Sequence, residues 1–349
     1  MKDLKYVLAY TIPISTYFSI TASGYFSFLT VLYAYGFIPL LEILLDQQDQ
    51  KYDVHEKENR LKNKLFDLML YINIPIVIGL LGLGLWQLST SSLTTFEQTG
   101  KVLSLGILLA TNGINVAHEL GHRVQTWERY GSKLLLCLSL YMHFYIEHNF
   151  GHHKNVATAE DPATAKKNQS LYGFWWTSIL GQIKSAWQLQ KLLLKQRNAS
   201  FFSLYNDVLF YFLFQGLYLI FLYVTLGAWG LFYGALVAFV SVLMLESINY
   251  IEHYGLLRKK GNSGRYEPVK TVHSWNSNHI VGRLVLYELT RHSDHHHRAS
   301  KKYQVLENSA ESPQLPWGYP TSMLVALIPP LWFSKIHPRL EAFEGNAKL

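Results

Sequence analysis

The sequence predicts an all-α protein embedded in a membrane, with six transmembrane helices and a histidine-rich cap on the cytoplasmic side. Of its 349 residues, 49% are hydrophobic and only 16% are charged, against about 25% charged residues in ordinary soluble domains. The apolar residues form long blocks. These blocks lack the polar face that recurs roughly every 3.6 residues in surface helices. The histidines concentrate in the second part of the chain, where 14 of 15 follow residue 117.

The individual helices are predicted from blocks that can cross a bilayer, which takes roughly 17–25 residues. In chain order these blocks are Tyr6–Ile20, Tyr25–Leu45, Leu65–Trp86, Val102–Val116, Leu204–Leu226 and Trp229–Ile251. The first block follows Lys2 and Lys5, as a signal peptide would, but Pro13 interrupts it and no clear cleavage site follows. We therefore interpret the first two blocks as a helical hairpin.

Three hairpins result, joined by short outer turns at residues 21–24, 87–101 and 227–228. We expect them to form one membrane-embedded domain covering residues 1–349, without internal repeats or flexible linkers.

The basic residues predict the orientation of the chain. With the N-terminus in the cytoplasm, 30 of the 31 Lys and Arg residues fall on the inner side and only Lys101 lies outside. We therefore expect both termini and the histidines on the cytoplasmic side of a bacterial inner membrane. The net charge of +7 is thus a topology signal, and no aromatic-studded basic stripe indicates nucleic-acid binding.

The single cysteine, Cys137, excludes an intrachain disulfide and a built-in four-cysteine iron site. The chain also has no GxGxxG after a strand and no CxxC pair. We therefore expect any oxidation of NAD(P)H to take place in another protein.

Four histidine clusters follow the predicted helices. The sequence HELGH holds His118 and His122, which lie four residues apart and therefore share one helical face. An HxxxH pair alone is a weak signal, and HExxH is also the zinc-protease pattern, but seven more histidines follow in similar positions. The remaining clustered histidines are His148, His152, His153, His253, His292, His295 and His296.

Nine candidate ligands are too many for one zinc ion, which needs about four. They suit two metal ions with open coordination positions, and imidazole is compatible with iron, copper, zinc or nickel. A structural role for any one cluster stays open, but ionisable residues at membrane depth are costly and usually functional.

The four boxes HELGH, EHNFGHH, NYIEHYGL and RHSDHH resemble those of the integral-membrane alkane monooxygenases. The flanks at 157–163 (ATAEDPA) and 273–279 (HSWNSNH) are also similar, and the resemblance covers roughly residues 30–335. It implies six membrane helices and two non-haem irons held by the nine histidines. It also implies terminal hydroxylation of an alkane with O₂ and electrons from rubredoxin, which rubredoxin reductase reduces. One departure is His297, where the family usually has a small residue, and we expect its side chain to face solvent or to lie behind the ligands.

Ligating histidines need a partner for the second ring nitrogen. The candidates inside or beside the boxes are Glu119, Glu147, Glu252 and Asp294, and weaker candidates are His143, His273 and His279. Each of them is equally compatible with a structural hydrogen bond.

An alkane offers no polar group, so its binding must come from burial, at about 0.8 kcal/mol per CH₂. We expect a slot between membrane helices that fills from the lipid. Some members of the alkane monooxygenase family that the sequence resembles have a bulky aromatic residue at the position of Ala34. Ala34 would then leave the slot open for long chains, unless it is an ordinary packing residue.

Two further enzyme classes and one transporter class stay open. A membrane fatty-acyl desaturase or a xylene-type aryl-methyl monooxygenase would use the same boxes. A metal transporter would place its ligands near the bilayer midplane, whereas these boxes lie at helix ends. For an acidic carrier such as rubredoxin, the candidate contacts are Arg258, Lys259, Lys260, Lys301 and Lys302.

Overall fold

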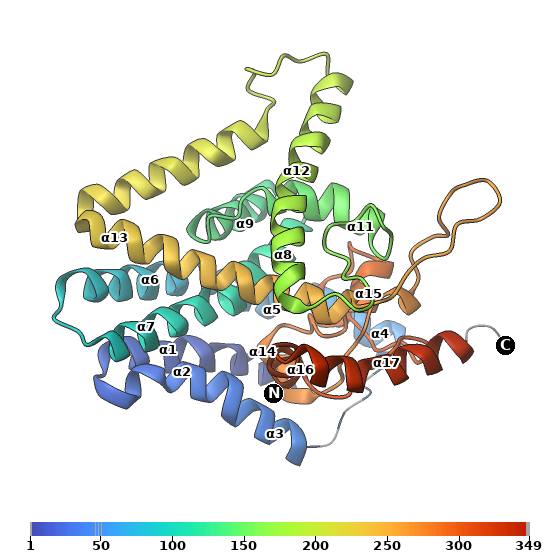
Figure 1. The fold of residues 1–349 in the computed structure, drawn as a ribbon, viewed down its shortest axis with the longest axis horizontal. Helices are drawn as coiled ribbons and strands as arrows, with labels where there is room; N and C mark the ends of the chain where they lie inside the picture. Colours follow the sequence, from blue (N-terminus) through green and yellow to red (C-terminus); the bar gives the residue numbers. More distant parts are fainter. Residues whose placement is uncertain (1, 46, 48, 50, 347–349) are drawn as a thin grey trace.

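The computed structural model describes residues 2–45, 47, 49 and 51–346 (Figure 1). Within these residues every regular element is helical, apart from two isolated β-bridges. The N-terminal half contains α1 Thr11–Thr21, α2 Leu29–Leu32, α3 Ile38–Leu44, α4 Val54–Lys62, α5 Lys64–Tyr71, α6 Asn73–Thr90, α7 Thr95–Leu108, α8 Asn115–Gly121, α9 Thr126–Leu138, α10 Phe144–Ile146 and α11 His153–Asn155. The remainder contains α12 Leu171–Gln196, α13 Asp207–His253, α14 Ile280–Val285, α15 His292–His297, α16 Tyr319–Ala326 and α17 Pro329–Asn346. The predicted all-α class is confirmed.

Four helical segments of the described chain are long and apolar enough to cross a membrane. They are Gly24–Leu44, Lys64–Thr90, Thr95–Gly121 and Asp207–His253. The last one contains two of the predicted spans, because Gly227 breaks α13 with φ 71° and ψ −166°. Only glycine adopts this backbone conformation readily, so the turn predicted at 227–228 depends on that residue.

The first predicted span, Tyr6–Ile20, is not one of these four segments. Residues Lys2–Tyr10 wind as a 3₁₀ helix, and the α-helical part is limited to α1. Pro13 lies in the first turn of α1, where its missing N–H group removes no helical hydrogen bond. The proline therefore favours the start of a new helix over the interior of a long one.

Three wide π-helical turns interrupt the helices: Tyr33–Phe37, Leu109–Ile114 and Glu147–His152. The first lies between α2 and α3, the second between α7 and α8, and the third between α10 and α11. Such turns shift the direction of the side chains that follow them and are frequent at functional sites.

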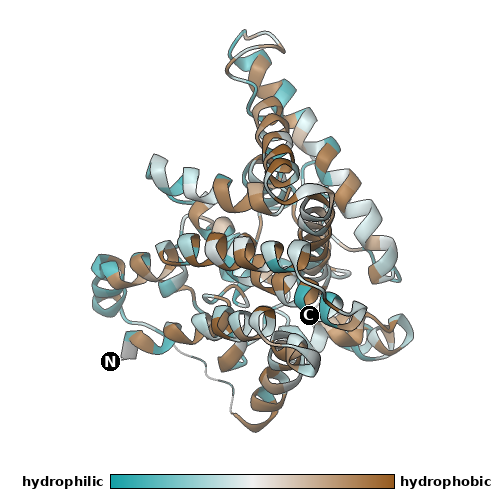
Figure 2. Cartoon of the chain, turned by 90° about the vertical axis from the view of Figure 1, so that its left-hand side faces the viewer, coloured by the Kyte–Doolittle hydropathy of each residue, from teal (hydrophilic) through white to brown (hydrophobic). Residues whose placement is uncertain are grey.

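The long helices place the histidines and the outer turns at opposite ends of the molecule. In Figure 1 the α6–α7 turn, the break in α13 and the α1–α2 turn lie on the left, while α11, α15 and the C-terminus lie on the right. Figure 2, viewed from the turn side, shows hydrophobic residues along the helices that meet there.

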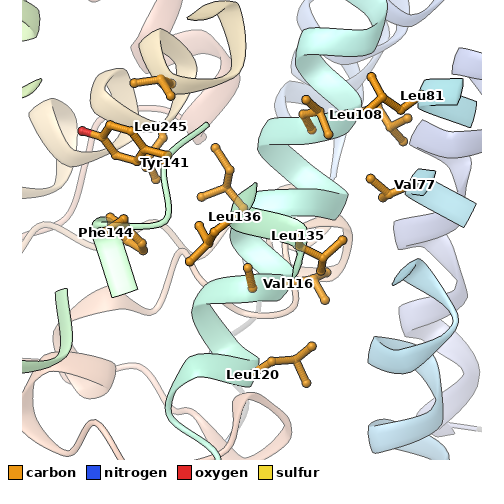
Figure 3. Close-up of a cluster of buried hydrophobic side chains, with 14 of the residues drawn as sticks. Val77, Leu81, Leu108, Val116, Leu120, Leu135, Leu136, Tyr141, Phe144 and Leu245 are labelled. Atoms are coloured by element: carbon orange, nitrogen blue, oxygen red, sulfur yellow. The ribbon is translucent and has the colours of Figure 1, made fainter. Parts of the chain in front are cut away.

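The core is built where these helices pack on the segment that carries the first histidine box. Figure 3 shows Val77 and Leu81 of α6 facing Leu108 of α7, with Val116 and Leu120 of α8 facing α9. All five side chains are almost completely buried. This packing fixes α8, and with it His118, relative to the rest of the bundle.

Candidate metal centre

The nine predicted ligands come from five separate elements and meet in two groups. The first group contains His118, His122, His148, His153 and His295, and the second contains His152, His253, His292 and His296. In each group, ligand atoms from all members lie within 4.8 Å of one another. The structure thus brings together all nine histidines that the sequence singled out.

The second box is divided between the two groups by its π-helical turn. His148 and His153 are five residues apart, and a π-helix repeats its hydrogen bonds from i to i+5. These two rings therefore point the same way, with their Nε2 atoms 3.0 Å apart. His152 points to the other group, where its Nε2 atom lies 3.2 Å from that of His296.

The Nε2 atoms of the first group are too close to be explained by hydrogen bonds alone. Those of His122, His148 and His153 form a triangle with sides of 3.1, 3.0 and 3.3 Å. A neutral imidazole nitrogen either donates or accepts, so at least two of the three must have the same role and repel each other. Nitrogen ligands at about 2.0–2.1 Å from a divalent ion lie about 3 Å apart. The donor set therefore fits a bound metal ion.

The second group has the same geometry. The Nε2 atoms of His296 and His292 lie 2.8 Å apart, and those of His292 and His253 lie 3.1 Å apart. The rings of His153 and His296, one from each group, have centroids 4.6 Å apart. The two candidate ion sites are therefore neighbours.

Burial keeps most of these imidazoles neutral, which is the form that binds metal ions. Burial, reinforced by Arg123, lowers the pKa of His122 to about 4. The pKa of His295 is lowered well below its ordinary value by burial and then by neighbouring histidines. At pH 7 these rings thus present lone pairs.

Asp161 gives His152 a different electrostatic environment. Burial alone would lower the pKa of His152, but the Asp161 carboxylate raises it above its ordinary value. The Oδ2 atom of Asp161 accepts a hydrogen bond from Nδ1 of His152 at 2.9 Å and another from the Thr164 hydroxyl at 2.6 Å. Nε2 of His152 is thereby left free to face His296. The sequence analysis quoted Asp161 within a flank but did not assign it this role.

Among the predicted partners, Glu252 lies directly against the second group. Its Oε2 atom is 3.2 Å from Nε2 of His292, and its Oε1 atom accepts a 2.7 Å hydrogen bond from the Tyr319 hydroxyl. Tyr319 also lines an apolar cavity. Glu252 therefore connects the histidines to that cavity.

The structure gives the other acidic candidates different partners. Glu147 is buried beside the second box, close enough to His152 to help raise its pKa, and accepts from Ser185 at 3.3 Å. Glu119 pairs with Arg123 at 2.9 Å, and Asp294 pairs with Lys301 at 2.5 Å. The last two carboxylates hold the backbone around the boxes.

The weaker histidine candidates also lie outside the two groups. His143 stacks edge-on against Tyr141, His273 accepts from the Lys270 backbone at 3.0 Å, and His279 contacts the Ser277 hydroxyl at 2.9 Å. His297 is exposed, with Nδ1 3.4 Å from the carbonyl of Val269. Its expected role, facing solvent or lying behind the ligands, stays a prediction.

Ala34 lies in the first π-helical turn, where it is 7% exposed and lines the same apolar cavity as Tyr319. Its role in selecting chain length stays a prediction. No pattern in the sequence indicated Glu288, which pairs with Arg283 at 2.7 Å and with Arg291, the first residue of the RHSDHH box, at 3.4 Å.

Comparisons with known proteins agree with this site. Residues 99–337 match the model of the fatty acid desaturase family. The chain is 38% identical over 330 residues to alkane 1-monooxygenase of Pseudomonas putida, covering 92% of this chain and 79% of the relative. It is 39% identical over 318 residues to alkane 1-monooxygenase 1 of Alcanivorax borkumensis, covering 88% and 76%.

A more distant relative has a different name. The hydroxylase component of xylene/toluene monooxygenase from Pseudomonas putida is 28% identical over 290 residues, covering 80% of this chain and 75% of the relative. Identity is thus higher to the alkane enzymes over a larger share of the chain. The chain belongs to the alkane 1-monooxygenases of the fatty acid desaturase family.

Proposed function

We propose that the protein hydroxylates the terminal carbon of an alkane. One atom of O₂ enters the C–H bond to give a 1-alkanol, and the other leaves as water after two electrons and two protons are supplied. The observation that carries this proposal is the convergence of nine imidazoles next to an apolar cavity. The names of the relatives at 38% and 39% identity support the same reaction.

We further propose that the two groups of histidines hold two non-haem iron ions. When bound, iron would supply the oxidising chemistry that an unactivated C–H bond requires. The protein keeps the imidazoles neutral by burial, and Asp161 fixes the ring of His152 so that Nε2 faces inward. Once side chains move aside to admit an alkyl chain, the apolar lining of the cavity would keep water from the chain and bind it by burial alone.

Rubredoxin is the proposed electron donor, itself reduced by rubredoxin reductase. In support, His122 and His153 of the first group are half-exposed, whereas the four members of the second group are buried. The exposed Lys259 and Lys260 lie in the loop between α13 and α14, which projects from the right side of Figure 1. An acidic carrier would find positive charge there.

We propose six membrane crossings within a single domain in a bacterial inner membrane, with both termini cytoplasmic. The break at Gly227 divides α13 into two candidate crossings, and η1 with α1 would supply the first. Large apolar side chains on α13, such as Leu213, Ile220 and Phe239, are exposed and suit contact with lipid.

The proposal is tested on purified protein by metal analysis together with an O₂- and rubredoxin-dependent assay on octane and hexadecane. We expect about two irons per chain and 1-alkanol as the product. An iron-loaded protein that instead desaturates an acyl lipid, or oxidises only the methyl group of xylene, would refute the alkane assignment.

A further inference from the structure

Two apolar hollows lie between the lipid-facing side of the bundle and the second histidine group. The outer one, here called the groove, has a volume of about 310 Å³ and lies between α7, α12, α13 and α16. The inner one is the cavity that Ala34 and Tyr319 line. Four residues line both hollows and therefore separate them: Tyr35, Ile107, Met244 and Met323.

The groove suits an alkyl chain because its polar atoms are already hydrogen-bonded. The indole N–H of Trp175 donates to the Ser247 hydroxyl at 3.1 Å, and that hydroxyl donates to the Leu243 carbonyl at 2.7 Å. Leu324 and Leu327 at its edge are 40% and 39% exposed. In a membrane these two side chains would meet lipid, so the groove can fill directly from the bilayer.

The inner cavity is too small for an alkyl chain as the side chains stand. Its volume is about 50 Å³, against about 310 Å³ for the groove. Its inner end is Tyr319, whose hydroxyl donates to Glu252, the residue that contacts His292. A chain that reaches the histidines by this route must therefore push side chains aside.

The side chains most easily moved are the two methionines in the shared wall. Methionine is unbranched and adapts its shape at low cost. The Tyr35 hydroxyl lies 3.9 Å from the Met323 sulfur, which is a weak contact that closes the wall. Two π-helical turns border the cavity as well, with Ala34 and Tyr35 from one and Ala110 and Thr111 from the other.

We propose that Tyr35, Met244 and Met323 form a gate that an alkane opens on its way from the groove to the histidines. Ile107, the fourth residue that lines both hollows, stays in place. This inference rests on the proposed function and adds the entry route and the residues that control it. The alkyl chain displaces the two methionine side chains and lies between them while it is bound.

Thiol labelling tests the gate without measuring activity. The Met244→Cys variant, in a Cys137→Ser background, is treated with a membrane-permeable maleimide in lipid nanodiscs, with and without hexadecane. We expect hexadecane to slow labelling several-fold, because the chain occupies the gate. Val224→Cys is the matched control, since Val224 is on the same helix, 75% exposed and outside both hollows. Equal labelling of Met244→Cys with and without hexadecane, or equal slowing in both variants, would overturn the gate.

Turnover of the Met323→Trp variant supplies a second, independent measurement. A larger ring in the gate should lower kcat/KM for octane and hexadecane alike while the bound iron is unchanged. A wild-type kcat/KM in this variant would also overturn the gate. The two proposals fail separately: protection of Met244→Cys in a protein that oxidises no alkane refutes the proposed reaction alone, and alkane oxidation without protection refutes the gate alone.

Discussion

Among single residues, one histidine from each group tests whether that group binds iron. His295 belongs to the first group and His152 to the second. We expect His295→Ala and His152→Ala each to lower bound iron and abolish hydroxylation, while the protein still inserts into the membrane. Metal analysis and product yield measure this, with the exposed His297→Ala as the control that keeps both. Full activity in either variant would remove its group from the iron site.

Asp161 contacts His152, a proposed iron ligand, so its replacement should weaken iron binding without removing a ligand. Asp161→Asn keeps the shape but loses the charge that orients the imidazole. Loss of such a partner lowers metal affinity by about 10–100-fold, which a competition titration with a chelator measures. Glu160→Gln, a change at the exposed neighbouring residue, is the control. If both variants bind iron equally well, the contact between Asp161 and His152 is not important for the site.

At the scale of elements, the first π-helical turn directs Ala34 into the inner cavity. Ala34→Trp should fill this cavity and shift preference from hexadecane and dodecane toward octane. We expect the ratio of kcat/KM values to shift by about tenfold or more, because one methylene in an apolar pocket changes this ratio by about 10–200-fold. Leu32→Trp, a change at a residue that is 62% exposed on α2, is the matched control. Product yields from the three alkanes, with iron content measured in parallel, decide the outcome. An unchanged profile would mean that Ala34 does not face the substrate.

The break in α13 depends on one backbone conformation. Gly227 has φ 71° and ψ −166°, and a side chain in that region costs about 1–3 kcal/mol. Gly227→Ala should therefore lower the thermal unfolding midpoint in detergent. Gly216→Ala is the matched control, because Gly216 lies within helical α13 and an added Cβ meets nothing within 4 Å. A midpoint equal to that of the control would show that the break tolerates other residues.

For the whole molecule, the exposed lysines that follow Arg258 predict how the electron donor binds, because Arg258 donates to the carbonyl of Lys154, the residue after His153. Charge reversal at Lys259 and Lys260 should raise KM for rubredoxin several-fold at low salt, and high salt should reduce the difference, because salt screens long-range attraction. Lys191→Glu, at an exposed position on α12, is the control. Turnover that is insensitive to salt, or to the charge at both positions, would contradict this docking model.

Several of the candidate docking residues already have partners within the protein. Arg258 donates to the carbonyl of Lys154 at 2.8 Å, Lys301 pairs with Asp294, and Lys302 pairs with Asp67 at 3.0 Å. These three contacts stabilise the segments around the histidines. Lys260 lies 3.7 Å from Glu160, but both side chains are more than half exposed, so Lys259 and Lys260 are the better positions for the test. The sequence could not make this distinction for Arg258 and Lys302, because their partners are 104 and 235 residues away along the chain.

The sequence by itself determined the all-helical class, most of the apolar segments and the identity of the nine clustered histidines. These features are local: a block of apolar residues has the length of a bilayer, and HELGH places two rings on one face of a helix. The break at Gly227 was also predictable, because a glycine separates two such blocks.

Only the tertiary structure decided how the histidines divide into five and four, and which carboxylates meet them. The division depends on the π-helical turn at Glu147–His152. Neighbouring helices stabilise this turn, and no residue pattern predicts it. The contact between Asp161 and His152 depends on how the loop between them folds, and the contact between Glu252 and His292 depends on how α13 and α15 pack. The same holds for the gate, since Tyr35, Met244 and Met323 become neighbours only when three separate helical segments come together.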